Sequence, residues 1–152
     1  RNFAVEGLQE VRKIVHDLKP EQMDKKQLDI ALEEFFHEVQ VNSGIDIQFR
    51  KNEPTFSLTS EAELSIFRGV QEAITNAMRH GQATRITVLL MYNPSQLVVT
   101  IKDNGTGAVD LAPKGGLKSL QERLRSEGGS VTFEASNSGV TVQMILPNTE
   151  KQ

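Results

Sequence analysis

The sequence predicts an α+β fold, a two-layer sandwich in which a mixed, mainly antiparallel sheet is covered on one face by helices and is preceded by one further helix. Long segments with helical hydrophobic spacing are separated by short segments with alternating spacing, and four of the short segments form two pairs joined by turns. This order differs from the one-by-one alternation of a doubly wound fold. A chain of 152 residues suits one compact domain with a sizeable core.

The first predicted element is a helix over residues 2 to 19, which ends at Pro20 because proline interrupts helical hydrogen bonding. Its apolar residues are spaced alternately four and three apart, at Ala4, Leu8, Val11, Val15 and Leu18. This spacing is typical of the seam of a coiled coil or helical hairpin. Packing on a partner helix and packing on the domain's own core fit the pattern equally.

A second helix is predicted over about residues 24 to 42, ending near Gly44 because glycine suits the position after a helix. Its buried face is predicted to hold Leu28, Ala31, Leu32, Phe35, Phe36 and Val39. Residues 45 to 50 then alternate apolar and polar side chains, which predicts a strand.

A third helix is predicted to begin after Thr59 or Ser60 as its cap, with Glu63 in the first turn, and to run to about His80. The side of this helix that is predicted to face the core holds Phe67, Val70, Ile74, Ala77 and Met78.

Two hairpins complete the predicted sheet. Their strands cover residues 85 to 92 with 97 to 103, and 130 to 135 with 140 to 146, around turn-forming residues. A helix from Gly116 to about Glu127 lies between the hairpins in the sequence and ends at Gly128. Pro147 follows the last strand, and residues 148 to 152 are expected to fray.

Composition excludes several classes of function. A net charge of −3 with scattered Lys and Arg argues against a nucleic-acid partner. No run of about 18 apolar residues and no export leader occurs, so we expect no membrane contact by this part of the protein. The absence of cysteine excludes disulfides and fits a cytoplasmic protein.

Because the chain opens inside a predicted helix without Met, we expect it to be a fragment of a longer protein.

Four polar residues are predicted to share one stripe of the third helix. Glu72, Asn76 and His80 are successively four apart, and Arg79 lies beside them. Stacked along two turns, these groups can position a water, hold a divalent cation and face a polyphosphate. A solvated helix face is the alternative, and compensation of the helix dipole also explains Arg79 and His80. Asn is roughly 0.5 kcal/mol or more worse than Ala inside a helix, so a task for its side-chain oxygen would explain Asn76.

Alternation along the strand from 97 to 103 places Asp103 on the apolar face, together with Val99 and Ile101. A carboxylate buried there needs hydrogen-bond donors, because an unpartnered one costs several kcal/mol. The amino group of adenine is one such donor, and Gly105 and Gly107 would let the backbone approach a flat ring. An Asx-type turn, in which Asp103 caps its own loop, is the alternative.

The segment after Asp103 is rich in glycine and ends at a helix N-terminus, where free N–H groups suit an anion. Its glycines are Gly105, Gly107, Gly115 and Gly116. Such a loop can close as a lid over a ligand, and a bare surface connection is the alternative.

The order Glu-x-x-x-Asn, Asp-x-Gly-x-Gly and Gly-Gly-Leu resembles the ATP-binding family shared by histidine kinases, gyrase-type topoisomerases, the ninety-kilodalton heat-shock chaperones and mismatch-repair ATPases. The stretches at 72 to 76, 103 to 107 and 115 to 117 resemble its N, G1 and G2 boxes. The fuller pattern over 71 to 83 and 116 to 129 is most similar to sensor histidine kinases that partner helix-turn-helix response regulators. The similarity spans about residues 5 to 147.

The resemblance implies a GHKL, or Bergerat-type, fold that binds ATP and Mg²⁺ and transfers the γ-phosphoryl group to a histidine. It implies that Glu72 is the base or orients a water, that Asn76 binds Mg²⁺ and that Asp103 reads adenine. The other residues that it assigns to the nucleotide site are Arg79, His80, Gly105, Gly107, Gly115, Gly116 and Leu117.

The resemblance also implies three parts and several partners. Residues 1–20 would be the end of a dimerisation helix, residues 21–147 the ATP-binding catalytic domain and residues 148–152 a tail. The expected partners are acceptor-histidine dimerisation helices and a response regulator, with a homodimer in the full-length protein. In such kinases the acceptor histidine lies on an earlier helix, so we expect it to be absent from this chain. His16 is followed too closely by the nucleotide domain, and His37 is expected to pack or lie on the surface.

Two departures from the family pattern predict weak ATP affinity. Lys114 stands where the first glycine of Gly-x-Gly-Leu is usual, and Val140 stands where a Gly-Thr pair is common.

Two other functions remain open: a non-catalytic ATP-binding module, and an anti-sigma-type kinase that phosphorylates serine. The latter would not need the seam of the first predicted helix. Gyrase-like and chaperone-like functions are disfavoured, because those proteins use longer chains with a transducing domain.

Overall fold

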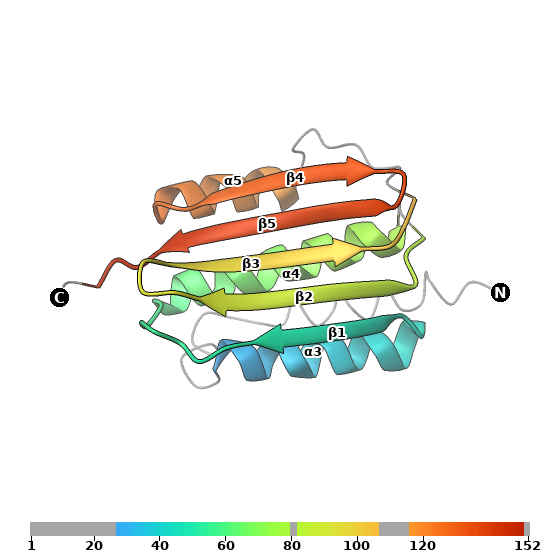
Figure 1. Cartoon of the computed structure of the whole chain (residues 1–152), viewed down its shortest axis with the longest axis horizontal. Helices are drawn as coiled ribbons and strands as arrows, with labels where there is room; N and C mark the ends of the chain where they lie inside the picture. The colour runs from blue at the N-terminus through green and yellow to red at the C-terminus, as the bar shows by residue number, and fades with distance from the viewer. Residues whose placement is uncertain (1–26, 80–81, 107–115, 151–152) are drawn as a thin grey trace.

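The computed structural model describes residues 27–79, 82–106 and 116–150. In this part a five-stranded sheet carries three helices on one face, as Figure 1 shows. The elements are α3 (Leu28–Ser43), β1 (Asp46–Lys51), α4 (Ser60–Arg79), β2 (Arg85–Tyr92), β3 (Gln96–Asp103), α5 (Gly116–Ser126), β4 (Ser130–Ser136) and β5 (Gly139–Pro147). The predicted α+β sandwich is therefore confirmed. The helix predicted over residues 2 to 19 lies outside the described residues.

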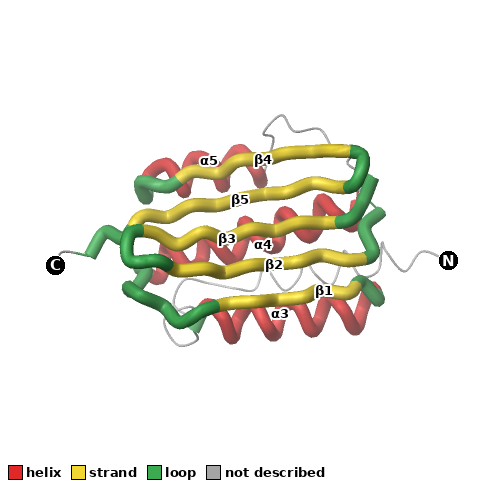
Figure 2. The backbone as a smooth tube through the Cα atoms, viewed as in Figure 1, coloured by secondary structure: helices red, strands yellow, loops and turns green. Residues whose placement is uncertain are grey.

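The strands lie in the order β1-β2-β3-β5-β4. β1 and β2 are parallel, with α4 as the connection between them, and all other neighbours are antiparallel. Figure 2 shows the two hairpins, β2–β3 and β4–β5, as neighbouring pairs of the same sheet. The sheet is thus mixed and mainly antiparallel: the α4 crossover joins the parallel neighbours β1 and β2, and short turns join the strands of the two antiparallel hairpins.

The ends of the helices follow from local chemistry. The hydroxyl of Thr59 accepts a hydrogen bond from the backbone N–H of Ala62 at 3.1 Å, which identifies Thr59 as the cap of α4. Gly44 takes a left-handed φ of 75° and its N–H bonds to the carbonyl of Gln40, as the sequence predicts for the end of α3. Gly128 has a φ of 82° and ends α5 in the same way.

α4 packs against α3 through large aromatic side chains, and on its other side it lies close to α5 and β5. The ring of Phe35 on α3 meets that of Phe67 on α4 edge to face, with centroids 5.4 Å apart. On the other side of α4, a Cβ added at Gly69 would lie 2.5 Å from the sulfur of Met144 and 3.0 Å from both methyl carbons of Leu120. Glycine at this position lets α5 and β5 approach α4 closely.

α4 is the central helix of the layer and is buried around most of its surface. The predicted core residues on it are all at most 7% exposed. Three polar side chains, Ser65, Gln71 and Thr75, are buried with them, and the amide of Gln71 donates to the hydroxyl of Thr75 at 3.1 Å. This burial holds α4 rigidly under the sheet, so side chains near its C-terminal end are well positioned.

Asn148 and Glu150, which follow β5, form hydrogen bonds with earlier parts of the chain. The backbone N–H of Asn148 donates to the carbonyl of Ser95 at 2.8 Å, and its side-chain amide donates to that of Pro94 at 3.0 Å. Glu150 contacts the backbone N–H of Ser57. The fraying expected from residue 148 therefore does not begin at Asn148, because the β2–β3 turn supplies two acceptors for it. Residues 151 and 152 lie outside the described part.

Among the described helices, none combines the length and the apolar character that a membrane crossing requires.

Candidate nucleotide-binding site

The residues predicted to bind a nucleotide lie at one end of the sheet. α4 ends at Arg79, the chain then enters β2, and Ile86 near the start of β2 pairs with Asp103 at the end of β3. The backbone N–H of Ala83 also bonds to the carbonyl of Ala77 at 3.2 Å, which ties this end of α4 to the sheet. The predicted stripe and the predicted adenine-reading carboxylate are therefore brought to the same end of the domain.

Asp103 points into the protein, as the alternation of β3 predicts, and is only 6% exposed. Its Oδ1 accepts two backbone hydrogen bonds, from Gly105 N at 2.9 Å and from Val140 N at 3.2 Å. The first of these is the Asx-type turn that the sequence left as an alternative. None of the described residues donates to Oδ2, so the turn and a ligand on the second oxygen are compatible.

The β4–β5 turn closes on Asp103 because residue 139 is a glycine. Gly139 has a φ of 134°, and a Cβ there would lie 1.9 Å from the backbone oxygen of Asp103 and 2.9 Å from its Oδ1. No larger residue fits at these distances. Gly139 thereby allows the N–H of Val140 to reach the carboxylate.

Three residues of the predicted polar stripe lie on the described part of α4. Glu72 and Asn76 are both half-buried, one turn apart, and Arg79 is exposed at the end of the helix. The side chain of Asn76 makes no hydrogen bond with other described residues, and its amide oxygen is a hard ligand of the kind that Mg²⁺ prefers. Asn76 therefore fits a magnesium site. His80 lies outside the described residues.

Only the two ends of the glycine-rich segment are described. Gly105 is buried beside Asp103, and Gly116 is the first residue of α5. Gly107, Lys114 and Gly115 lie outside the described residues, as does the side chain of Leu117. The predicted lid therefore stays a prediction.

Asn104 is a residue of this region that sequence reasoning missed. Its Oδ1 accepts hydrogen bonds from the backbone N–H groups of Thr84 and Arg85, both at 2.9 Å. Its amide donates to the hydroxyl of Thr84 at 3.0 Å. These bonds anchor the start of the glycine-rich segment to the start of β2. The Asp-Asn-Gly triplet signals a turn in the sequence but does not identify this partner strand.

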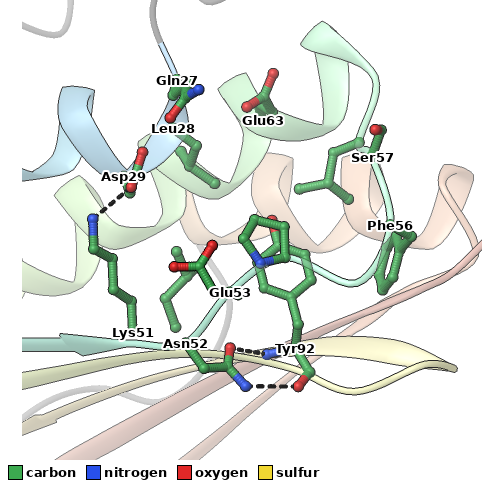
Figure 3. Close-up of a pocket in the computed structure, with 13 residues that line it drawn as sticks. Gln27, Leu28, Asp29, Lys51, Asn52, Glu53, Phe56, Ser57, Glu63 and Tyr92 are labelled. Atoms are coloured by element: carbon green, nitrogen blue, oxygen red, sulfur yellow. Dashed lines mark hydrogen bonds and ion pairs between the residues drawn. The ribbon is translucent and has the colours of Figure 1, made fainter.

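A separate pocket of about 530 Å³ lies at the opposite end of the sheet (Figure 3). It is lined by the starts of α3 and α4 and by the ends of β1 and β2, which include Asp29, Glu63 and Tyr92. Asn52 exchanges two hydrogen bonds with the backbone of Tyr92 at its floor. Because Asp103 lies near the start of β2 and Tyr92 ends it, this pocket is distinct from the predicted nucleotide site.

Tyr92 provides a pH-dependent prediction at this second pocket. Burial, and then the nearby carboxylates of Glu63 and Asp29, raise the pKa of Tyr92 to about 12. In the unfolded chain its pKa is about 10, so the unfolded state loses this proton first. We expect the free energy of unfolding to decrease as pH rises from about 10 to 12, and this decrease to be smaller in Tyr92→Phe.

Tyr92 is the only tyrosine of the chain, so its absorbance titration reports this group alone. A midpoint near pH 10 in the folded protein would contradict the prediction.

The comparisons with known proteins agree with this fold. The family model described as histidine kinase-, DNA gyrase B- and HSP90-like ATPase matches residues 61–150. This match covers more than half of the chain, and it includes α4, β3 and α5. The chain belongs to this family of ATPases.

Within that family, the chain is similar to sensor histidine kinases. It is 34% identical over 155 residues to YxjM of Bacillus subtilis and 29% identical over 149 residues to MctS of Rhizobium johnstonii. The aligned parts cover 96% and 94% of this chain but 36% and 32% of those proteins. The chain therefore spans about a third of the length of these relatives.

Solved structures show the same fold. The histidine kinase domain of a blue-light activated histidine kinase from Erythrobacter litoralis superposes with a TM-score of 0.66 at 17% identity, covering 96% of this chain and 75% of that one. The ATP-binding domain of PrrB from Mycobacterium tuberculosis superposes with a TM-score of 0.56 at 21% identity, covering 76% and 88%. At these identities the structures support the fold class and not the chemistry.

Proposed function

We propose that this chain is the ATP-binding catalytic domain of a two-component sensor histidine kinase, which transfers the γ-phosphoryl group of ATP to a histidine on a dimerisation helix. The observation that supports the proposal is that α4, which carries the half-buried pair Glu72 and Asn76, ends at the end of the sheet where the buried carboxylate of Asp103 lies. The similarity to sensor histidine kinases over nearly the whole chain supports it.

In this proposal each residue has one task. Asp103 Oδ2 accepts a hydrogen bond from the adenine amino group, while the N–H groups of Gly105 and Val140 hold Oδ1. Asn76 holds Mg²⁺, which when bound neutralises charge on the phosphates. Glu72 acts as the base or holds the neutral tautomer of the acceptor histidine.

The remaining site residues complete the nucleotide site. Arg79 and His80 face phosphate oxygens, and Gly105, Gly107, Gly115, Gly116 and Leu117 form the loop around the nucleotide. Guanidinium and imidazolium groups suit phosphate because they donate charge-assisted hydrogen bonds.

The partners follow from the same chemistry. We propose that dimerisation helices supply the acceptor histidine, that the full-length protein is a homodimer in the cytoplasm, and that a response regulator receives the phosphoryl group. Residues 1–20 would be the end of a dimerisation helix and residues 21–147 the catalytic domain.

A transfer assay tests the proposal. The chain is incubated with labelled ATP, Mg²⁺ and the separately produced acceptor hairpin of YxjM, and the products are separated by their stability to acid. Acid-labile, base-stable label on the hairpin is expected, as phosphohistidine requires. Binding of ATP without any transfer would support a non-catalytic ATP-binding module instead, and acid-stable label would support an anti-sigma-type serine kinase.

Asn76→Asp tests the metal ligand in particular. The substitution keeps the size of the side chain but replaces the amide by a carboxylate, whose charge opposes the approach of the phosphates. We expect ATP binding in the presence of Mg²⁺ to weaken at least about tenfold, the equivalent of roughly 1.4 kcal/mol. Because Asn76 has no hydrogen bond to lose among the described residues, the free energy of unfolding should stay nearly unchanged. Calorimetric titrations identical to those of the wild type would contradict the assignment.

A further inference from the structure

Arg68 extends the polar stripe of α4 beyond the proposed phosphate site. It lies four residues before Glu72 and eight before Asn76, so the three share one face of the helix. At 1.5 Å per residue, Arg68 is about 12 Å along the axis from Asn76, on the side away from Asp103. A group bound by Arg68 would therefore lie past the terminal phosphate, on the side from which an acceptor must approach.

Arg68 is half-buried, and one nitrogen of its guanidinium lacks a hydrogen-bond partner in the described part of the chain. Its Nε is inaccessible to solvent and, within the described part of the chain, has no hydrogen-bond partner. Buried side-chain donors are nearly always paired, because a lost hydrogen bond is not replaced by water. No other buried side-chain nitrogen or oxygen among the described residues is left in this state. Arg68 therefore has hydrogen-bonding capacity that no described residue uses.

A second cation, Arg123, lies close enough to Arg68 for the two charges to repel. α4 and α5 cross at Gly69, where an added Cβ would be 3.0 Å from two methyl carbons of Leu120, and Arg123 lies one turn further along α5. Burial, and then repulsion by Arg123, lower the pKa of Arg68. Arg123 in the last turn of α5 is explained by the helix dipole, but Arg68 in the middle of α4 is not. An anion bound between these two cations would relieve their repulsion and could complete the hydrogen bonding of Arg68.

We propose that Arg68 and Arg123 together bind a carboxylate of the helix that carries the acceptor histidine, and so position that helix against the terminal phosphate. This proposal rests on the proposed function. Guanidinium groups bind carboxylates through paired, charge-assisted hydrogen bonds. At the other end of the site the β4–β5 turn packs on Asp103, and in this proposal the acceptor helix approaches from the Arg68 side. Arg68 is thus a positioning residue, one turn from Glu72.

Arg68→Met separates this role from a structural one. Methionine keeps much of the apolar stem but removes the unpaired Nε, so the midpoint of thermal unfolding should stay the same or rise. Affinity for the acceptor hairpin of YxjM, measured calorimetrically with a non-hydrolysable ATP analogue and Mg²⁺ present, should fall about tenfold or more. Affinity for the analogue itself should change by less than about twofold. Arg123→Met should weaken hairpin binding in the same direction.

Arg125→Met is the matched control, because Arg125 is an exposed arginine on the same helix, α5. It should leave hairpin binding unchanged. Wild-type binding should weaken as salt increases, and this dependence should be smaller in Arg68→Met.

Several outcomes would overturn the inference. If Arg68→Met lowered the unfolding midpoint and left hairpin binding unchanged, the role of Arg68 would be structural. If the variant bound the ATP analogue more weakly, Arg68 and Arg123 would instead contact the nucleotide phosphates. If Arg125→Met lost as much hairpin affinity as Arg68→Met, the effect would come from the overall positive charge of the domain and not from Arg68 in particular. Because hairpin binding is measured without transfer, these outcomes are distinct from a failure of the proposed kinase activity, which only the transfer assay reports.

Discussion

Asp103→Asn is expected to reduce the affinity for ATP by roughly a hundredfold while leaving the fold intact. Hydrogen bonds that involve a charged group contribute roughly 1.5–3 kcal/mol, or about 10- to 150-fold in affinity. In the variant an amide oxygen can still accept from the N–H groups of Gly105 and Val140, which hold Oδ1 in the wild type. The amide nitrogen then takes the place of Oδ2, where a donor would meet the donor of adenine.

Calorimetric titration with ATP measures this loss, and denaturant unfolding shows that the domain remains folded. Asp46→Asn is the matched control, because Asp46 is an exposed aspartate at the start of β1 whose side chain forms an ion pair with Arg85. Exposed ion pairs contribute little to stability, so neither ATP affinity nor stability should change much. An unchanged titration for Asp103→Asn would remove Asp103 from the adenine site.

Gly139→Ala is expected to destabilise the domain and weaken ATP binding at the same time. A side chain at a φ of 134° is strained, and the added Cβ would lie 1.9 Å from the backbone oxygen of Asp103. Strain and overpacking each cost roughly 1–3 kcal/mol, so we expect a loss of at least about 2 kcal/mol in the free energy of unfolding. The β4–β5 turn must move away from Asp103, and the N–H of Val140 then no longer orients the carboxylate.

Gly44→Ala is the control that separates backbone strain from steric clash, because it introduces the strain alone. Gly44 also has a positive φ, 75°, but no atom lies within 4 Å of an added Cβ. This substitution should cost roughly 1–2 kcal/mol in stability and leave ATP affinity at the wild-type value. If Gly139→Ala also kept full ATP affinity in the folded protein, the turn would have no part in holding Asp103.

Local sequence patterns predicted the fold well at residues whose type or spacing restricts the local conformation. Gly44 and Gly128 end their helices because both adopt a left-handed φ that other residues avoid. The alternation of β3 correctly placed Asp103 among buried apolar residues, since side chains of a strand point to opposite faces in turn. The hairpins followed from their turn residues, and their antiparallel pairing is confirmed.

Contacts between distant segments were not predictable from the sequence. Ser138-Gly139 signals a turn, but nothing in it shows that the turn closes on a carboxylate 36 positions earlier. Arg68 could have been noticed, because it continues the same spacing as Glu72 and Asn76. Its unpaired Nε and its proximity to Arg123 depend on the crossing of α4 and α5, which no local pattern contains.

The sequence by itself determined the order of the elements, the face on which Asp103 lies and the stripe that Glu72 and Asn76 share, because helical and strand periodicity dictate side-chain direction. The tertiary structure decided the rest: the parallel pairing of β1 with β2, the glycine contact that holds the Asp103 carboxylate, and the electrostatic repulsion between Arg68 and Arg123. These features arise from long-range packing, where the shape of one segment sets the space left for another.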